Sequence, residues 1–105
     1  IGVNCEDAAA ASAVCEKLNE AFDLPVKDGS SSMFASSGIE VMKSMFKGKN
    51  GHIAIHTNSV ELAVAELAKK GFAYDESSAK YKNGRMTVAY LKDEFGGFAV
   101  HLLQK

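Results

Sequence analysis

An internal repeat constrains the fold of this chain more than any other feature. Both halves of the 105 residues show the same expected order, one strand, one helix and three strands, on either side of a polar segment at 47–51. Residues 1–4 match residues 53–56 at an offset of 52. A single helix covers only one face of such a sheet. The repeat therefore predicts an α+β fold of two βαβββ modules forming a cupped, barrel-like mixed sheet around a cavity suited to a ligand.

Periodicity and capping signals place the first helix. Asp7 is a good N-cap residue, and Val14, Leu18 and Phe22 recur at helical spacing as one apolar stripe. We therefore expect a helix that ends near Phe22. Pro25 confines the short strand that follows to an edge of the sheet.

The second helix is expected over residues 59–70. Asn58 and Glu61 have the spacing of a capping box, and Gly71 suits the position just after the helix. Alternating and apolar runs predict the remaining strands, at residues 24–27, 32–36, 39–44, 52–56, 72–75, 86–91 and 98–103.

Length and composition favour one soluble domain over residues 1–105, with pseudo-repeats at 1–46 and 52–105. Hydrophobic residues make up 47% and the formal net charge is −1, so the sequence shows no general field for nucleic acid or an anionic membrane. Two cysteines, Cys5 and Cys15, cannot form a disulfide framework and indicate a reducing, cytoplasmic setting. A strand that begins at Ile1 suggests a fragment of a longer chain.

Strand alternation selects the residues that would face the cavity. With the bulkier apolar side chains turned toward the helices, Glu40, His52 and His101 fall together on the opposite, concave face. Neighbouring positions on that face predict further cavity-lining residues, namely Met42, Ala54 and Ala99.

Two imidazoles and one carboxylate form a known ligand set for a divalent metal such as Zn, Fe, Ni or Mn, with positions left open for a substrate. The alternative for each residue is structural, since a lone His or Glu on a strand is usually solvated or hydrogen-bonded. Both interpretations of Glu40, His52 and His101 stay open on the sequence alone.

Over its whole length the chain resembles the vicinal oxygen chelate superfamily, which includes glyoxalase I, extradiol dioxygenases and fosfomycin-resistance proteins. His52 in the segment 51–55 matches the first-strand histidine of the second module, and Glu40 in 38–42 matches the last-strand glutamate of the first. His101 stands where that superfamily usually has glutamate, and the remaining histidine would precede Ile1. The resemblance implies a glyoxalase-like fold and a metal held by these strands.

A closer resemblance is to the C-terminal domain of bacterial 2-dehydro-3-deoxy-phosphogluconate / 4-hydroxy-2-oxoglutarate aldolases. It rests on the segments 38–44, 57–61, 76–81, 90–94 and 96–102. In those lyases a (β/α)₈ barrel carries the Schiff-base lysine, and this chain lacks the ~200 residues and repeated βα units that a barrel needs. The resemblance therefore implies an appended domain that is not catalytic alone, with the barrel as its partner in the same chain.

Three functions follow as expectations. The first is an accessory domain of a carbohydrate-metabolism lyase that binds a small anionic metabolite or supports assembly into a homo-oligomer such as a dimer. The second is an autonomous metal-dependent enzyme acting on vicinal oxygens, and the third is a dimerisation module with an unused pocket.

Overall fold

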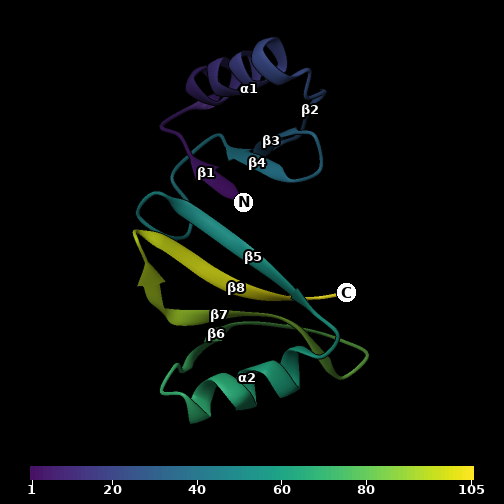
Figure 1. The fold of residues 1–105 in the computed structure, drawn as a ribbon, viewed down its shortest axis with the longest axis vertical. Coiled ribbons are helices and arrows are strands. Elements are labelled where there is room, and N and C mark those ends of the chain that lie inside the picture. The colour runs from purple at the N-terminus through teal and green to yellow at the C-terminus, as the bar shows by residue number, and fades with distance from the viewer. The chain divides into compact units, whose positions relative to one another are not determined.

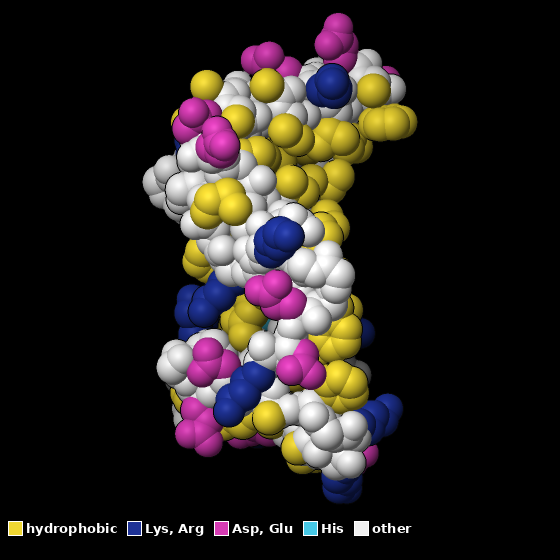
Figure 2. Space-filling model, turned by 90° about the vertical axis from the view of Figure 1, so that its left-hand side faces the viewer, with side chains coloured by type: hydrophobic (Ala, Val, Ile, Leu, Met, Phe, Trp, Pro, Cys, Tyr) yellow, Lys and Arg dark blue, Asp and Glu magenta, His cyan; other side chains and the backbone are white.

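The computed structural model describes residues 1–105 and divides into two compact units. The first unit is Ile1–Gly51 and the second is His52–Lys105. No helix in it is long and apolar enough to pass through a membrane. Acidic and basic side chains are interspersed over the face seen in Figure 2, in keeping with the net charge of −1.

The first unit is a four-stranded sheet with one helix. Its strands lie in the order β2-β3-β4-β1, in which β1 and β4 are parallel and the other neighbours antiparallel. Pro25 immediately precedes β2, which is an edge strand of this unit, as its sequence predicted. The elements in chain order are β1 (Gly2–Asn4), α1 (Ala8–Phe22), β2 (Val26–Asp28), β3 (Ser32–Ala35) and β4 (Ile39–Met42).

The second unit repeats this order of elements (Figure 1). Its strands lie in the order β5-β8-β7-β6, with antiparallel pairing of β6 to β7 and of β7 to β8. The elements are β5 (Gly51–Thr57), α2 (Val60–Lys69), β6 (Tyr74–Lys82), β7 (Arg85–Phe95) and β8 (Phe98–Gln104). The α+β class and the two βαβββ modules expected from the sequence are confirmed.

The first helix begins where its cap predicts. The Ala10 backbone N–H donates to the Asp7 carboxylate at 2.8 Å, which satisfies one of the free donors of the first turn. Ala11 and Cys15 are fully buried against the sheet, whereas Phe22 is 69% exposed. The predicted stripe was therefore wrong at its last residue, because Phe22 is the final residue of α1 and stays exposed there.

The second helix is capped one residue later than expected. Ser59 is the N-cap, and its hydroxyl oxygen accepts from the Leu62 backbone N–H at 3.2 Å. Asn58 instead offers its carbonyl to the side chain of Gln104. The predicted capping box with Glu61 was wrong, because Ser59 in the same sequence competes for the cap. The end was predicted correctly, since Gly71 follows the helix with φ of 92°.

The last three strands are longer than the sequence indicated. The expected strand at 72–75 extends as β6 to Lys82, and β7 continues to Phe95. They are joined at Asn83 and Gly84, both with positive φ, which is the geometry of a two-residue hairpin turn. The polar sequence of β6 lacks an alternating pattern because β6 is an edge strand with a register shift between Asp75 and Lys80.

Two further burial expectations were wrong. Apolar character predicts a core or pocket position for Met45, and strand alternation predicts that Ile55 covers a helix. Met45 is instead 60% exposed, because it lies beyond the end of β4, and Ile55 is 48% exposed.

Candidate functional site

The face of the second unit's sheet that lies against α2 is an ordinary apolar core. Val60 of α2 packs with Met86 and Ala89 of β7 and with Leu102 of β8. This placement of Leu102 agrees with the sequence-based assignment of the helix-covered face. The neighbouring His101 must therefore lie on the opposite face, because successive side chains of a strand alternate.

Three rings gather on that opposite face. The register pairs Tyr90 of β7 with His101 of β8, and their ring centroids lie 4.6 Å apart. His52 comes from β5, the neighbour of β8, and its ring centroid is 5.6 Å from that of His101. Only 5% of His52 and 8% of His101 are exposed to solvent. The prediction that the two histidines share one face is confirmed.

We call His52, Tyr90 and His101 the ring cluster. The rings are tilted by 35° and 46° rather than stacked flat. The Nδ1 atoms of both imidazoles are buried. An imidazole can donate and accept hydrogen bonds, so the cluster offers polar recognition chemistry within a largely covered surface.

The predicted lining residues of this unit lie close to the cluster in sequence. Ala99 is buried and shares the strand face of His101, while Ala54 is half-buried and shares that of His52. Their contact with a ligand stays a prediction. His56, farther along β5, is exposed.

The first unit shows a corresponding polar pair. Ile39 and Val41 of β4 face the core under α1, so Glu40 lies on the opposite face. The Ser32 hydroxyl donates to the Glu40 carboxylate at 2.7 Å, and Ser32 is 7% exposed. Met42, a predicted lining residue on the same face of β4, is 7% exposed.

The metal prediction requires three ligands from Glu40, His52 and His101. No group of three or more His, Cys, Asp or Glu side chains is placed to hold a metal ion. The donors brought together within the second unit are two imidazoles, and the glutamate belongs to the first unit. A metal held jointly by Glu40, His52 and His101 would draw ligands from both units, and it stays a prediction.

The sequence did not identify two residues of these surfaces, Tyr90 and Ser32, as candidates for the site. Tyr90 lies on a predicted strand, but no signal assigned it to the histidine face. Ser32 was visible only as part of a serine run. The hairpin around residues 37 and 38 could have revealed its role, because closing it pairs Ala35 with Ile39 and so brings Ser32 beside Met42.

The thiols of Cys5 and Cys15 both have a raised pKa. Burial raises the pKa of the Cys15 thiol, with Cys5 adding to the effect. Burial also raises the pKa of Cys5, followed by the negative charge of Asp7. A raised pKa leaves less thiolate, the nucleophilic form, at neutral pH.

Comparisons with known proteins are sparse. No family model and no curated protein matches the sequence. One solved structure that resembles the chain is TnmS3, an antibiotic binding protein from Streptomyces sp. CB03234. The two share 19% sequence identity and a TM-score of 0.40, over 99% of this chain and 91% of the other.

Proposed function

We propose that this chain is a non-catalytic domain that binds a small anionic metabolite, appended to an aldolase of the 2-dehydro-3-deoxy-phosphogluconate / 4-hydroxy-2-oxoglutarate type. The observation that carries the binding role is the ring cluster. Ligand sites are mostly apolar surfaces with a few convergent polar groups. His52 and His101, drawn from two strands and brought to 5.6 Å, are such groups.

The ring cluster favours an anionic or oxygen-rich ligand. Each imidazole N–H can donate a hydrogen bond to a carboxylate or phosphate oxygen. Tyr90 adds a flat apolar surface beside His101. A 2-oxo acid phosphate carries the anionic oxygens that such groups recognise.

The attachment to an aldolase rests on the sequence segments that resemble the C-terminal domain of those lyases. We assign the lyase chemistry to the barrel on that same resemblance, because the barrel of those lyases carries the Schiff-base lysine.

Ligand titration followed through the histidine ring signals tests the binding role. The protein is titrated with 2-keto-3-deoxy-6-phosphogluconate, pyruvate and inorganic phosphate while the carbon-bound protons of the imidazoles are observed by NMR. We expect saturable shifts of His52 and His101 with the sugar acid phosphate, and only a small change at the exposed His56. Absence of saturable shifts at both buried rings would contradict the proposal.

An activity assay tests the non-catalytic role. The isolated chain should not cleave 2-keto-3-deoxy-6-phosphogluconate, and borohydride in the presence of pyruvate should trap no adduct on any lysine. A trapped adduct would assign aldolase chemistry to this domain and overturn the proposal.

A further inference from the structure

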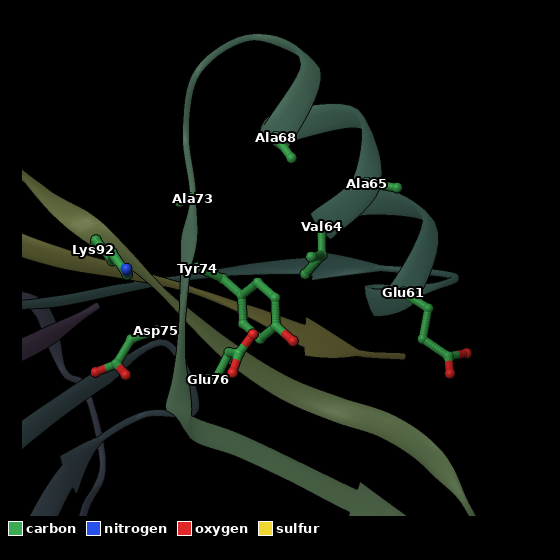
Figure 3. Close-up of a pocket in the computed structure, with 9 residues that line it drawn as sticks. All are labelled: Glu61, Val64, Ala65, Ala68, Ala73, Tyr74, Asp75, Glu76 and Lys92. Carbon is green, nitrogen blue, oxygen red and sulfur yellow. The ribbon is translucent and has the colours of Figure 1, made fainter.

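A groove of about 520 Å³ lies on the helix side of the second unit, away from the ring cluster. One wall is α2, and the other is the segment leading into β6 (Figure 3). Its lining combines small apolar side chains, one aromatic ring and several carboxylates. All of these residues belong to the second unit, so the groove is complete within it.

The floor of the groove is open because its side chains are small. Ala65 and Ala68 stand on one face of α2, and Ala73 stands on the opposite wall. All three are exposed. A hydrocarbon chain laid over them would remove apolar surface from water, which is favourable by about 25 cal/mol per Å².

The groove also carries an aromatic ring beside a carboxylate. Tyr74 points from β6 toward α2, and Glu76 extends next to its ring (Figure 3). Burial raises the pKa of the Tyr74 hydroxyl, and the negative charges of Tyr81 and Glu76 add to the effect. A cation is attracted both to a carboxylate and to the face of a tyrosine ring.

The charge balance of the groove is negative. Glu61, Asp75 and Glu76 contribute three carboxylates to the lining, against the single ammonium group of Lys92. Glu61 is engaged by Arg85 at 2.8 Å, and the Asp75 carboxylate accepts from the N–H and hydroxyl of Ser77. Glu76 is exposed to solvent.

The first unit provides an internal comparison. An equivalent groove of about 580 Å³ lies between α1 and β2. The repeat offset pairs Ser12 with Val64 and Glu16 with Ala68, so the groove of the first unit is polar where that of the second is apolar. It also has no aromatic residue in its lining. The combination of apolar floor, ring and carboxylate is therefore particular to the second unit.

We propose that the groove between α2 and β6 binds an amphipathic organic cation. Its ammonium group lies between the Glu76 carboxylate and the Tyr74 ring, and its hydrocarbon part covers Ala65 and Ala68. This site is separate from the ring cluster and prefers the opposite ligand charge. The chain would thus carry two binding surfaces in one unit, on opposite faces of a sheet.

The proposal is tested with n-hexylammonium as the probe on the isotope-labelled 105-residue chain at pH 7. Hexanol and hexanoate are matched probes of equal hydrocarbon length. We expect saturable amide shifts in α2 and at residues 73–76 with hexylammonium, at least fivefold weaker binding of hexanol and none of hexanoate. Equal binding of hexanoate and hexylammonium would overturn the assignment of a cation.

Variants separate the parts of the site. Glu76→Gln should weaken hexylammonium binding about fivefold, Tyr74→Leu by a similar factor, and Tyr74→Phe little, because it retains the ring. Ala68→Leu fills the floor at an exposed helix position and should abolish binding. Glu20→Gln, in the groove of the first unit, is the matched control and should change nothing. Unchanged binding by both Glu76→Gln and Ala68→Leu would overturn the proposal.

Discussion

The imidazoles of His52 and His101 lie 5.6 Å apart on the face of the second unit's sheet that α2 does not cover. Each ring comes from a different strand, so the pair exists only in the folded unit. His101 also contacts Tyr90 at 4.6 Å between ring centroids. The two imidazoles can therefore stabilise the fold by packing, bind a ligand, or do both. Substitutions of different size distinguish these roles.

Replacing His101 by Ala should destabilise the chain by about 2–4 kcal/mol, because a buried ring is exchanged for a cavity. His101→Phe keeps the ring volume and should cost less than ~1.5 kcal/mol, while losing binding of the anionic ligand. Urea unfolding measures the first effect and the NMR titration the second. If His101→Ala and His101→Phe lower the unfolding free energy equally, the imidazole nitrogens have a structural role.

Ser32→Ala removes the hydroxyl that donates to the Glu40 carboxylate at 2.7 Å. Because Ser32 is buried and its partner is ionisable, the variant should lose about 1–2 kcal/mol of unfolding free energy in urea. Ser12→Ala is the control, since its hydroxyl contacts Glu16 at 3.4 Å on an exposed helix surface. If Ser12→Ala loses as much unfolding free energy as Ser32→Ala, the hydrogen bond between Ser32 and Glu40 makes no particular contribution to stability.

Ser59→Ala should lower the unfolding free energy by about 1 kcal/mol, because the Leu62 N–H loses its acceptor at the start of α2. Asn58→Ala should cost less, since only the backbone carbonyl of Asn58 is used, by Gln104. Thermal or urea unfolding of the two variants shows whether Ser59 or Asn58 is the N-cap of α2. The reverse order would restore the capping box that the sequence suggested.

Local patterns predicted the parts of the fold that depend on neighbours in sequence. The period of two in residues 52–56 and 98–103 was enough to put His52 and His101 on one face, because side chains alternate along β5 and β8. Asp7 and Gly71 marked helix ends correctly for the same reason. Their effect requires only the adjacent turn of helix.

The sequence-based predictions that were wrong concern features that depend on pairing between strands. Simple alternation would put Met86 and Tyr90 on one face, yet Met86 packs under α2 and Tyr90 pairs with His101 on the other. The register of β7 against β6 shifts around Lys80, and such a shift reverses the facing of later residues. The groove beside Tyr74 was missed likewise, because β6 was predicted to end at residue 75.

The cysteines give a prediction for alkaline pH. Because burial raises the pKa of Cys15, the folded state holds its thiol proton more tightly than the unfolded state. Stability should therefore be unaffected at neutral pH and should fall as the pH rises above the ordinary thiol value of about 8.5. Alkylation by iodoacetamide at pH 8 should be slow at both cysteines, slower at the buried Cys15, and fast in urea. Rapid modification of folded Cys15 would contradict its burial.

Asp28 gives a prediction for acid pH. Its carboxylate lies 2.7 Å from the Lys43 ammonium group, and the hydrogen bond and then the charge of Lys43 lower the pKa of Asp28. A lowered folded-state pKa contributes stability that is present above the ordinary value of about 3.9 and is lost as the pH falls through the folded value. The contribution should be small and weakened by salt, because the Asp28 side chain is 71% exposed.

A pH titration of the Asp28 carboxyl carbon by NMR measures this directly. We expect its midpoint below the ordinary range in the wild type and a return to that range in Lys43→Gln. Asp28→Asn should differ slightly in stability from the wild type at pH 7 and converge with it at low pH, where the wild-type carboxyl is also neutral. An unchanged midpoint in Lys43→Gln would show that the ion pair does not persist in solution.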